Sequence, residues 1–151
     1  MNVPRAAGPN DAPELARLSG VLGYPADPHE MKTRLAHVLS EPDQHVAVIE
    51  SRGGRLAGWV HVQRLVSLEG GERAELMGLV VDSEERRSGV GRALVAAAEE
   101  WARTQGVQKI TVRSNLARAD SHPFYEALAY RRTKSQHVYV KKLNHDAERT
   151  K

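Results

Sequence analysis

The stretch 85–94, ERRSGVGRAL, contains the residues of this chain with the clearest chemical potential. Two arginines precede Gly89 and Gly91, and Arg92 follows them. Glycines let a ligand's phosphates approach the backbone, and a helix that begins in such a loop offers free N–H groups to an anion. The pattern therefore favours a pyrophosphate-binding loop, although a plain strand-to-helix turn with solvated arginines has the same composition.

The spacing narrows the choice of phosphate ligand. A P-loop ends in Gly-Lys followed by Ser or Thr, and GVGRAL lacks that ending. A dinucleotide fingerprint needs a third glycine and follows the first strand of a βαβ unit, whereas hairpins are predicted before this loop. Coenzyme A is the remaining common ligand that carries a pyrophosphate.

The elements that position this loop follow from the hydrophobic pattern. Helical spacing predicts helices within 10–23 and 24–42, with Asp11 and Asp27 as N-caps and Glu14 completing a capping box. Alternation and turn residues predict strands within 44–50, 55–66, 74–82 and 107–114, and broken strand within 130–142. Further helices are predicted within 88–106, ended by Gly106, and within 120–128. The order is roughly (β)ααβββαβαβ, an α+β fold.

Composition limits the class of protein. The 151 residues fit one domain, which we expect over 1–142 with a polar tail at 143–151. There is no cysteine, and the seven histidines are scattered, so we expect no metal site. No apolar run approaches the roughly 20 residues of a membrane span. The formal charge of +3 permits an anionic ligand without indicating nucleic acid. We expect a cytoplasmic protein.

Two longer segments carry a resemblance to a known family. These are AELMGLVVDSEERRSGVGRALV and VRSNLARADSHPFYEALAYRR. They resemble the GNAT superfamily of N-acetyltransferases, whose motif is Gln/Arg-x-x-Gly-x-Gly/Ala, with Arg86 in the leading position. The element order fits over about 3–142. The resemblance implies a mixed, mostly antiparallel sheet of six to seven strands flanked by about four helices. Ala129 departs from the family, which usually has glycine there.

The resemblance also implies acetyl-CoA as co-substrate. The pantetheine arm would pair with the backbone of the strand that precedes the loop, and the loop and helix N-terminus would bind the pyrophosphate. Asn115 would contact the arm, or else only end its strand and cap the turn. The implied cofactor-binding residues are Leu79, Val80, Val81, Arg86, Arg87, Ser88, Gly89, Val90, Gly91, Arg92 and Asn115.

Two residues are implied in catalysis. Tyr125 matches the family tyrosine that faces the leaving thiolate, and a phenol is protonated at neutral pH. Otherwise it is a core or rim tyrosine. Glu75 matches a catalytic glutamate of some members, and strict alternation would place it on the same face as Met77, Leu79 and Val81. It could accept the amine proton, directly or through a water, or be an exposed charge at the start of a strand.

The acceptor is expected to meet the segment between the first two helices. There Tyr24, Asp27 and Glu30 could hold a cationic amine or lie at the surface. The HPFYEALAY form resembles the small-amine and aminoglycoside-type members, which implies transfer to a primary amine of an aminoglycoside- or polyamine-like molecule. The alternatives are a protein or peptide acceptor and a CoA-binding regulatory module without turnover. His61 faces either the acceptor pocket or solvent. A homodimer through the last strands is a further expectation.

Overall fold

The computed structural model describes residues 2–21, 23, 25–85, 88–113 and 121–144. They fall into two units, residues 1–114 and residues 115–151, which are taken in turn. Among the described helices, none combines the length and apolar character that crossing a membrane requires.

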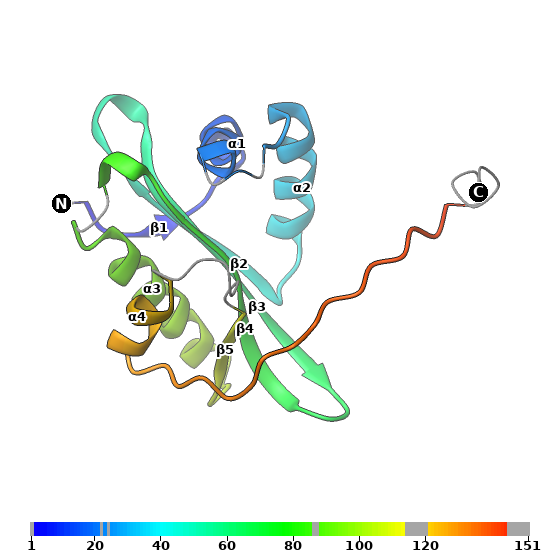
Figure 1. Ribbon diagram of the computed structural model, residues 1–151. Helices are drawn as coiled ribbons and strands as arrows, with labels where there is room; N and C mark the ends of the chain where they lie inside the picture. The colour runs from blue at the N-terminus through cyan, green and yellow to red at the C-terminus, as the bar shows by residue number, and fades with distance from the viewer. Residues whose placement is uncertain (1, 22, 24, 86–87, 114–120, 145–151) are drawn as a thin grey trace. The chain divides into compact units, whose positions relative to one another are not determined.

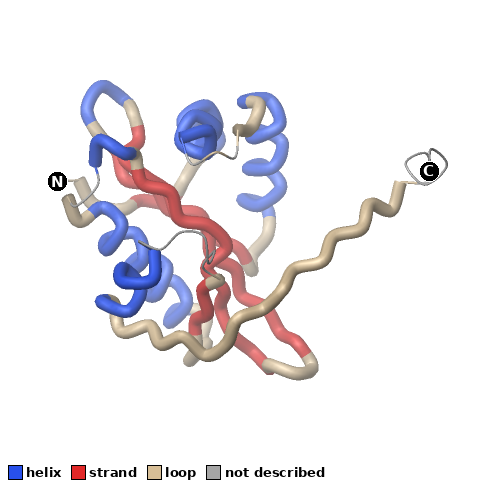
Figure 2. The backbone as a smooth tube through the Cα atoms, viewed as in Figure 1, coloured by secondary structure: helices blue, strands red, loops and turns tan. Residues whose placement is uncertain are grey.

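The first unit is built on a sheet with the strand order β1-β2-β3-β4-β5 (Figures 1 and 2). The strands β1 to β4 pair with one another in antiparallel fashion, and β5 is parallel to β4. Its elements are β1 (Arg5–Ala6), α1 (Ala12–Val21), α2 (Pro28–Ser40), β2 (Gln44–Glu50), β3 (Leu56–Ser67), β4 (Gly71–Val81), α3 (Val90–Thr104) and β5 (Ile110–Val112). The α+β class is thus confirmed.

Helices cover both faces of this sheet. Figure 1 shows α1 and α2 on one face and α3 on the other. On the first face, Leu18, Leu35 and Val48 belong to one buried cluster. On the second, α3 buries Leu94 and Ala98, as the helical spacing of its apolar residues predicts. Gly106, at φ 80°, follows the end of α3 as predicted.

The N-terminal ends of α1 and α2 differ from the capping prediction. Asp11 lies in a short 3-10 turn before α1, where it accepts a hydrogen bond from the Gly8 amide at 2.8 Å. Glu14 completes no capping box with it. Its carboxylate instead accepts from the Leu56 amide at 2.8 Å and pairs with Arg17, which ties α1 to β3. Asp27 does occupy the N-cap position of α2, but its side chain makes no capping hydrogen bond.

A β-bulge in β4 changes which residues share a face. His61 of β3 pairs with Gly78, and the next residue, Val62, pairs with Leu76, so Met77 is the extra residue. Paired residues point to the same face of a sheet. The bulge therefore reverses the alternation between the two halves of β4.

The predicted face of Glu75 is accordingly wrong. Leu79 and Val81 pair with Val60 and Gly58, on the face that carries α3. Glu75 pairs with Gln63 and so lies on the opposite face, the one that carries α1 and α2. Strict alternation fails here because a bulge shifts the two-residue period by one.

The second unit contains α4 (Ser121–Ala127), close to the predicted range. The described residues that follow α4, up to 144, form neither helix nor strand. The strand predicted within 130–142 is therefore absent from the described part of the chain, and the sheet has five strands instead of six to seven. A strand gains its backbone hydrogen bonds from a partner, which local alternation alone does not provide.

Candidate active site

The edge of β4 that faces β5 is only partly paired. The parallel ladder joins Ala74–Leu76 to Ile110–Val112 and ends there. Among the described residues, no strand pairs with Met77–Val81 on that side. This open edge includes Leu79, Val80 and Val81, the residues expected to pair with a pantetheine arm. An extended ligand with amide groups could bind there as an added strand does.

The open edge is followed in the chain by the loop that precedes α3. Gly89 is the N-cap, with φ 91° and ψ 3°, a left-handed conformation that favours glycine. Val90 is buried, and Gly91 and Arg92 lie in the first turn, whose amides have no partner within the helix. The predicted placement of these residues is therefore confirmed, while their contact with pyrophosphate stays a prediction. Arg86 and Arg87 lie outside the described residues.

Gly58 allows α3 to approach the sheet closely. A Cβ atom built at this position would lie 2.6 Å from the carbonyl oxygen of Val80 and 3.0 Å from Leu94 Cδ1. The strand glycine thus fixes the distance of the α3 N-terminus from β4. Sequence reasoning missed this role, although a glycine inside a strand is a signal of close approach.

An ion-pair network fixes the start of the loop between β4 and α3. Asp82 is buried directly after β4, and its carboxylate binds Arg17 Nη1 at 3.2 Å and the amide of Glu84 at 3.2 Å. Arg17 Nη2 also donates to the Leu56 carbonyl at 3.1 Å. The hydrogen bond from Arg17 lowers the pKa of the Glu14 carboxyl, so Glu14 and Arg17 form a charged pair at neutral pH.

Glu75 is held between two residues of the neighbouring segment. Its side chain is 13% exposed and lies 3.3 Å from Arg113 Nε. Thr111, its partner in the parallel ladder, has its hydroxyl 3.4 Å from the same carboxylate oxygen. Glu75 and Arg113 thus form an ion pair, and a carboxylate in this form is what a general base needs. Sequence reasoning missed both neighbours because the β4–β5 register was not predicted.

Tyr125 belongs to the second unit. Its ring is half-buried and makes edge contacts with the rings of Phe124 and Tyr130, at centroid distances of 5.1 and 5.8 Å. Its carbonyl oxygen accepts hydrogen bonds from the amides of Leu128 and Tyr130. Its catalytic role stays a prediction. Asn115 lies outside the described residues.

Two of the predicted acceptor-binding residues, Asp27 and Glu30, lie at the start of α2. Asp27 and Glu30 are exposed, and Glu30 pairs with Arg34 at 3.6 Å. Tyr24 lies outside the described residues. A pocket of about 570 Å³ lies beneath α2, and His61 is one of the residues that line it. Burial lowers the pKa of His61, which is therefore neutral at pH 7, and its Nε2 lies 2.7 Å from Gln44 Oε1.

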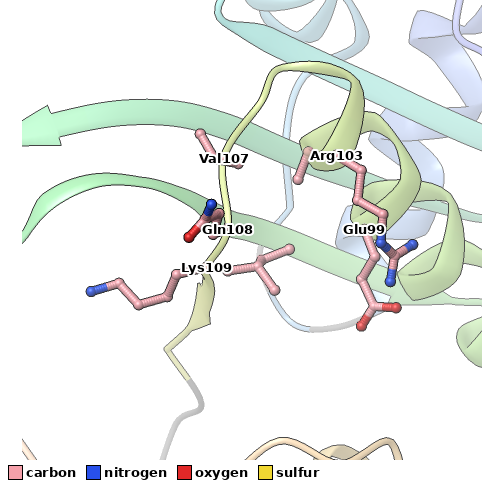
Figure 3. Close-up of a pocket in the computed structure, with 7 residues that line it drawn as sticks. Glu99, Arg103, Val107, Gln108 and Lys109 are labelled. Atoms are coloured by element: carbon pink, nitrogen blue, oxygen red, sulfur yellow. The ribbon is translucent and has the colours of Figure 1, made fainter.

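A second, smaller pocket lies at the opposite end of α3 from Gly89. It has a volume of about 140 Å³ and is lined by Glu99 and Arg103 of α3 and by the segment before β5 (Figure 3). Lys109 extends away from the two α3 side chains in this view. The pocket is remote from the α3 N-terminus, so it is separate from the loop expected to bind CoA. The described residues contain no cluster of side chains suited to a metal ion.

Comparison with known proteins defines the class. The model of the acetyltransferase (GNAT) family matches residues 13–130. The chain therefore belongs to the GNAT acetyltransferase family, and it is an acyl-CoA-dependent N-acetyltransferase. The family match covers both the open edge of β4 and α4.

Individual relatives agree with this membership. The aminoglycoside N(6')-acetyltransferase type 1 of Stenotrophomonas maltophilia is 26% identical over 133 residues, which cover 85% of this chain and 86% of that protein. N-acetyltransferase 8 of Homo sapiens is 31% identical over 62 residues, 41% of this chain and only 27% of that protein.

Solved structures show the same fold. An aminoglycoside 6'-N-acetyltransferase of Acinetobacter baumannii has a TM-score of 0.82 at 17% identity, covering 95% of this chain and 100% of that one. AAC(6')-Iy, solved in complex with the bisubstrate analogue CoA-S-monomethyl-acetylneamine, has a TM-score of 0.83 at 16% identity, covering 94% and 99%. The predicted GNAT fold is thus confirmed.

Proposed function

We propose that the protein transfers an acetyl group from acetyl-CoA to the primary amine of a small molecule, by direct attack within a ternary complex. One observation carries the proposal: one short loop separates the open edge of β4, which ends at Val81, from the glycine-capped N-terminus of α3, which begins at Val90. This path offers backbone groups to the pantetheine arm and helix amides to the pyrophosphate. The relative that was solved with a CoA bisubstrate analogue supports the ligand class.

In the proposed reaction the amine nitrogen attacks the thioester carbonyl, and the C–S bond breaks as the tetrahedral intermediate collapses. Glu75 accepts the proton that the amine loses, directly or through a water. Tyr125 donates a proton to the leaving thiolate, so that free CoA departs as a thiol. Backbone amides of Leu79–Val81 hold the arm, and Ser88–Arg92, together with Arg86, Arg87 and Asn115, bind the remainder of the cofactor.

The names of the relatives guide the choice of acceptor. Two of them are aminoglycoside N(6')-acetyltransferases, which supports aminoglycoside- or polyamine-like amines as the first set to assay. Asp27 and Glu30 are exposed carboxylates that could attract a cationic acceptor to α2. Peptide N-termini are the competing acceptors to include in the same assay.

Calorimetric titration tests the cofactor part of the proposal. We expect acetyl-CoA to bind with one-to-one stoichiometry, and NADH and ATP not to bind. The Gly89→Ala variant should bind acetyl-CoA about tenfold more weakly. A Cβ makes the left-handed conformation about 1–2 kcal/mol less favourable, so most of the free variant must return to it from another loop conformation before it binds. Gly20→Ala, where a Cβ meets no atom within 4 Å, is the matched control. Absence of acetyl-CoA binding would overturn the proposal.

Turnover tests the chemistry and the acceptor class. Release of free CoA thiol is followed with small amines and with peptides. Tyr125→Phe should retain acetyl-CoA binding and lose about 10²-fold in kcat. Unchanged turnover would remove the acid role of Tyr125. Activity with peptide N-termini alone would replace the small-molecule acceptor by a protein one, and cofactor binding without turnover on any acceptor would favour a regulatory module.

A further inference from the structure

The pocket beneath α2 is lined mainly by apolar side chains, which is unusual for a site that binds a polycation. It lies between α1, α2 and the strands β2 and β3, with a volume of about 570 Å³. Ligand pockets in proteins commonly have volumes of about 300–1,000 Å³. The residues that define its character are Leu15, Met31, Val38, Val46, Trp59 and His61.

This pocket lies one strand away from the open edge of β4, because β3 pairs with the opposite edge of β4. Its wall residues Trp59 and His61 pair with Val80 and Gly78 of β4, so they lie on the neighbouring strand, roughly 4.8 Å away. Glu75 lies on the same face of the sheet, because the bulge at Met77 places it there. An amine positioned at the edge of β4 could therefore extend the rest of its structure into the pocket.

The charges around the pocket disfavour a polycation. Among the described residues, its lining includes no carboxylate. Its basic residues Arg34 and His37 have exposed side chains, and they lie 3.6 Å from Glu30 and 3.8 Å from Glu41. Additional ammonium groups of a substrate would lose their hydration inside the pocket without gaining a partner.

One polar atom of the wall lacks a partner. Trp59 Nε1 is buried, and no hydrogen-bond partner for it exists among the described residues. Buried donors are nearly always satisfied in native proteins, by protein, water or ligand. Because this atom has almost no accessible surface, an acceptor on an occupant of the pocket can bind this N–H group only if the indole ring or a neighbouring side chain moves to expose it.

We propose that the preferred acceptor of this enzyme is a primary amine on an apolar body, aryl or long alkyl, that contains one hydrogen-bond acceptor and no further cationic group. The apolar body occupies the pocket beneath α2, and the amine nitrogen lies at the open edge of β4. This inference rests on the proposed function, since it treats the pocket as part of the acceptor site.

Binding is measured first, by calorimetry on the full chain. The probes are 4-(4-methoxyphenyl)butylamine, 4-phenylbutylamine and spermidine. We expect both aryl amines to bind at least tenfold more tightly than spermidine. Met31→Lys, which keeps the side-chain length but places a charge in the pocket, should weaken aryl-amine binding at least tenfold. His29→Lys adds the same charge to the same turn of α2, outside the pocket lining, and should change the affinity less than twofold.

The Trp59 donor is tested with the same probes. The methoxy compound should bind several-fold more tightly than 4-phenylbutylamine, and Trp59→Phe, which keeps an aromatic ring but removes the N–H group, should abolish that difference. A difference that persists in Trp59→Phe would overturn the assignment of the hydrogen bond to Trp59.

Turnover separates this inference from the proposed function. Acetylation of the aryl amines, with kcat/KM at least tenfold above that of spermidine and of the aminoglycoside neamine, would support both. Acetylation of spermidine or neamine combined with no aryl-amine binding would overturn the inference and leave the proposed function standing. Aryl-amine binding that Met31→Lys abolishes, without acetylation of any amine, would overturn the proposed function and the acceptor role, and leave an apolar ligand site.

Discussion

At the scale of single residues, Glu75 is the side chain whose surroundings the structure defines best. Its carboxylate is largely buried and is paired with Arg113 at 3.3 Å. We predict that Glu75→Gln lowers kcat by about 10²-fold, because a neutral amide cannot accept the amine proton. The Kd for acetyl-CoA should stay within twofold, since the backbone of β4 is unchanged. Thiol release and calorimetry measure the two quantities.

Glu69→Gln is the control for this loss of charge. Glu69 lies exposed in the turn between β3 and β4, far along the hairpin from Glu75. Its substitution should leave kcat unchanged. If Glu75→Gln retained full activity, the proton would have to leave through water or another group.

The same residue shows the limit of sequence reasoning at this scale. The position of Glu75 in a strand and that of Gly89 at the start of a helix could both be predicted, because each depends on local pattern. The face on which Glu75 lies could not, since it depends on the extra residue Met77 and on the pairing with β3. The neighbouring Gly78 is a signal that often marks a bulge, but it does not determine which residue is the extra one.

At the scale of elements, the contact between α3 and the sheet depends on Gly58. A methyl group there would approach the Val80 carbonyl to 2.6 Å, so α3 or β4 must shift. We predict that Gly58→Ala destabilises the fold by about 1–3 kcal/mol in urea unfolding, as overpacked cores do. It should also weaken acetyl-CoA binding, because the α3 N-terminus moves relative to β4.

Gly20→Ala provides the comparison for Gly58→Ala. Gly20 lies in the last turn of α1, and a Cβ there meets nothing within 4 Å. Alanine should stabilise the protein by up to about 1 kcal/mol, since it favours the helix. Equal effects of the two substitutions would contradict the steric role of Gly58.

The end of α4 carries local strain. Ala129 has φ 71°, in the left-handed region where a Cβ costs about 1–2 kcal/mol. We predict that Ala129→Gly stabilises this turn by about 1 kcal/mol, so that the Tyr130 amide, bonded to the Tyr125 carbonyl at 3.0 Å, exchanges roughly fivefold more slowly. Ala127→Gly, within the helix, should have the opposite effect. Faster exchange in Ala129→Gly would contradict the strain.

At the scale of the whole molecule, the α+β class and most of the element order could be predicted, because the hydrophobic period changes clearly between helices and strands. The open edge of β4 could not be predicted from its own residues. It exists because β5 is only Ile110–Val112, a length that alternation in the segment 107–114 does not fix. The pocket beneath α2 was not predicted either, since it requires side chains from four elements that are distant in sequence.

The stability of the protein at acid pH depends on one partly buried histidine on each face of the sheet. His61 lies on the face that carries α2, and His45, stacked on Trp101 at 5.6 Å, lies on the face that carries α3. Burial lowers the pKa of both below the ordinary value of 6.5. Below that pH the unfolded chain binds more protons than the folded one, so stability must fall as the pH falls toward the lowered pKa values. Asp11 and Glu14, whose pKa values are lowered from 3.8 and 4.5, bind protons only at a more acidic pH, so they do not contribute to the pH dependence of stability near neutral pH.

We therefore predict that the free energy of unfolding decreases between pH 7.5 and 5.5, and that His45→Gln combined with His61→Gln removes most of that decrease. Urea unfolding at the two pH values measures it, with the double variant compared against its own value at pH 7.5, because the loss of packing affects both conditions equally. His29→Gln, at an exposed position of α2, should leave the pH dependence of the wild type intact. An unchanged decrease in the double variant would show that other groups bind the protons, and the two buried histidines would then have no part in the acid response.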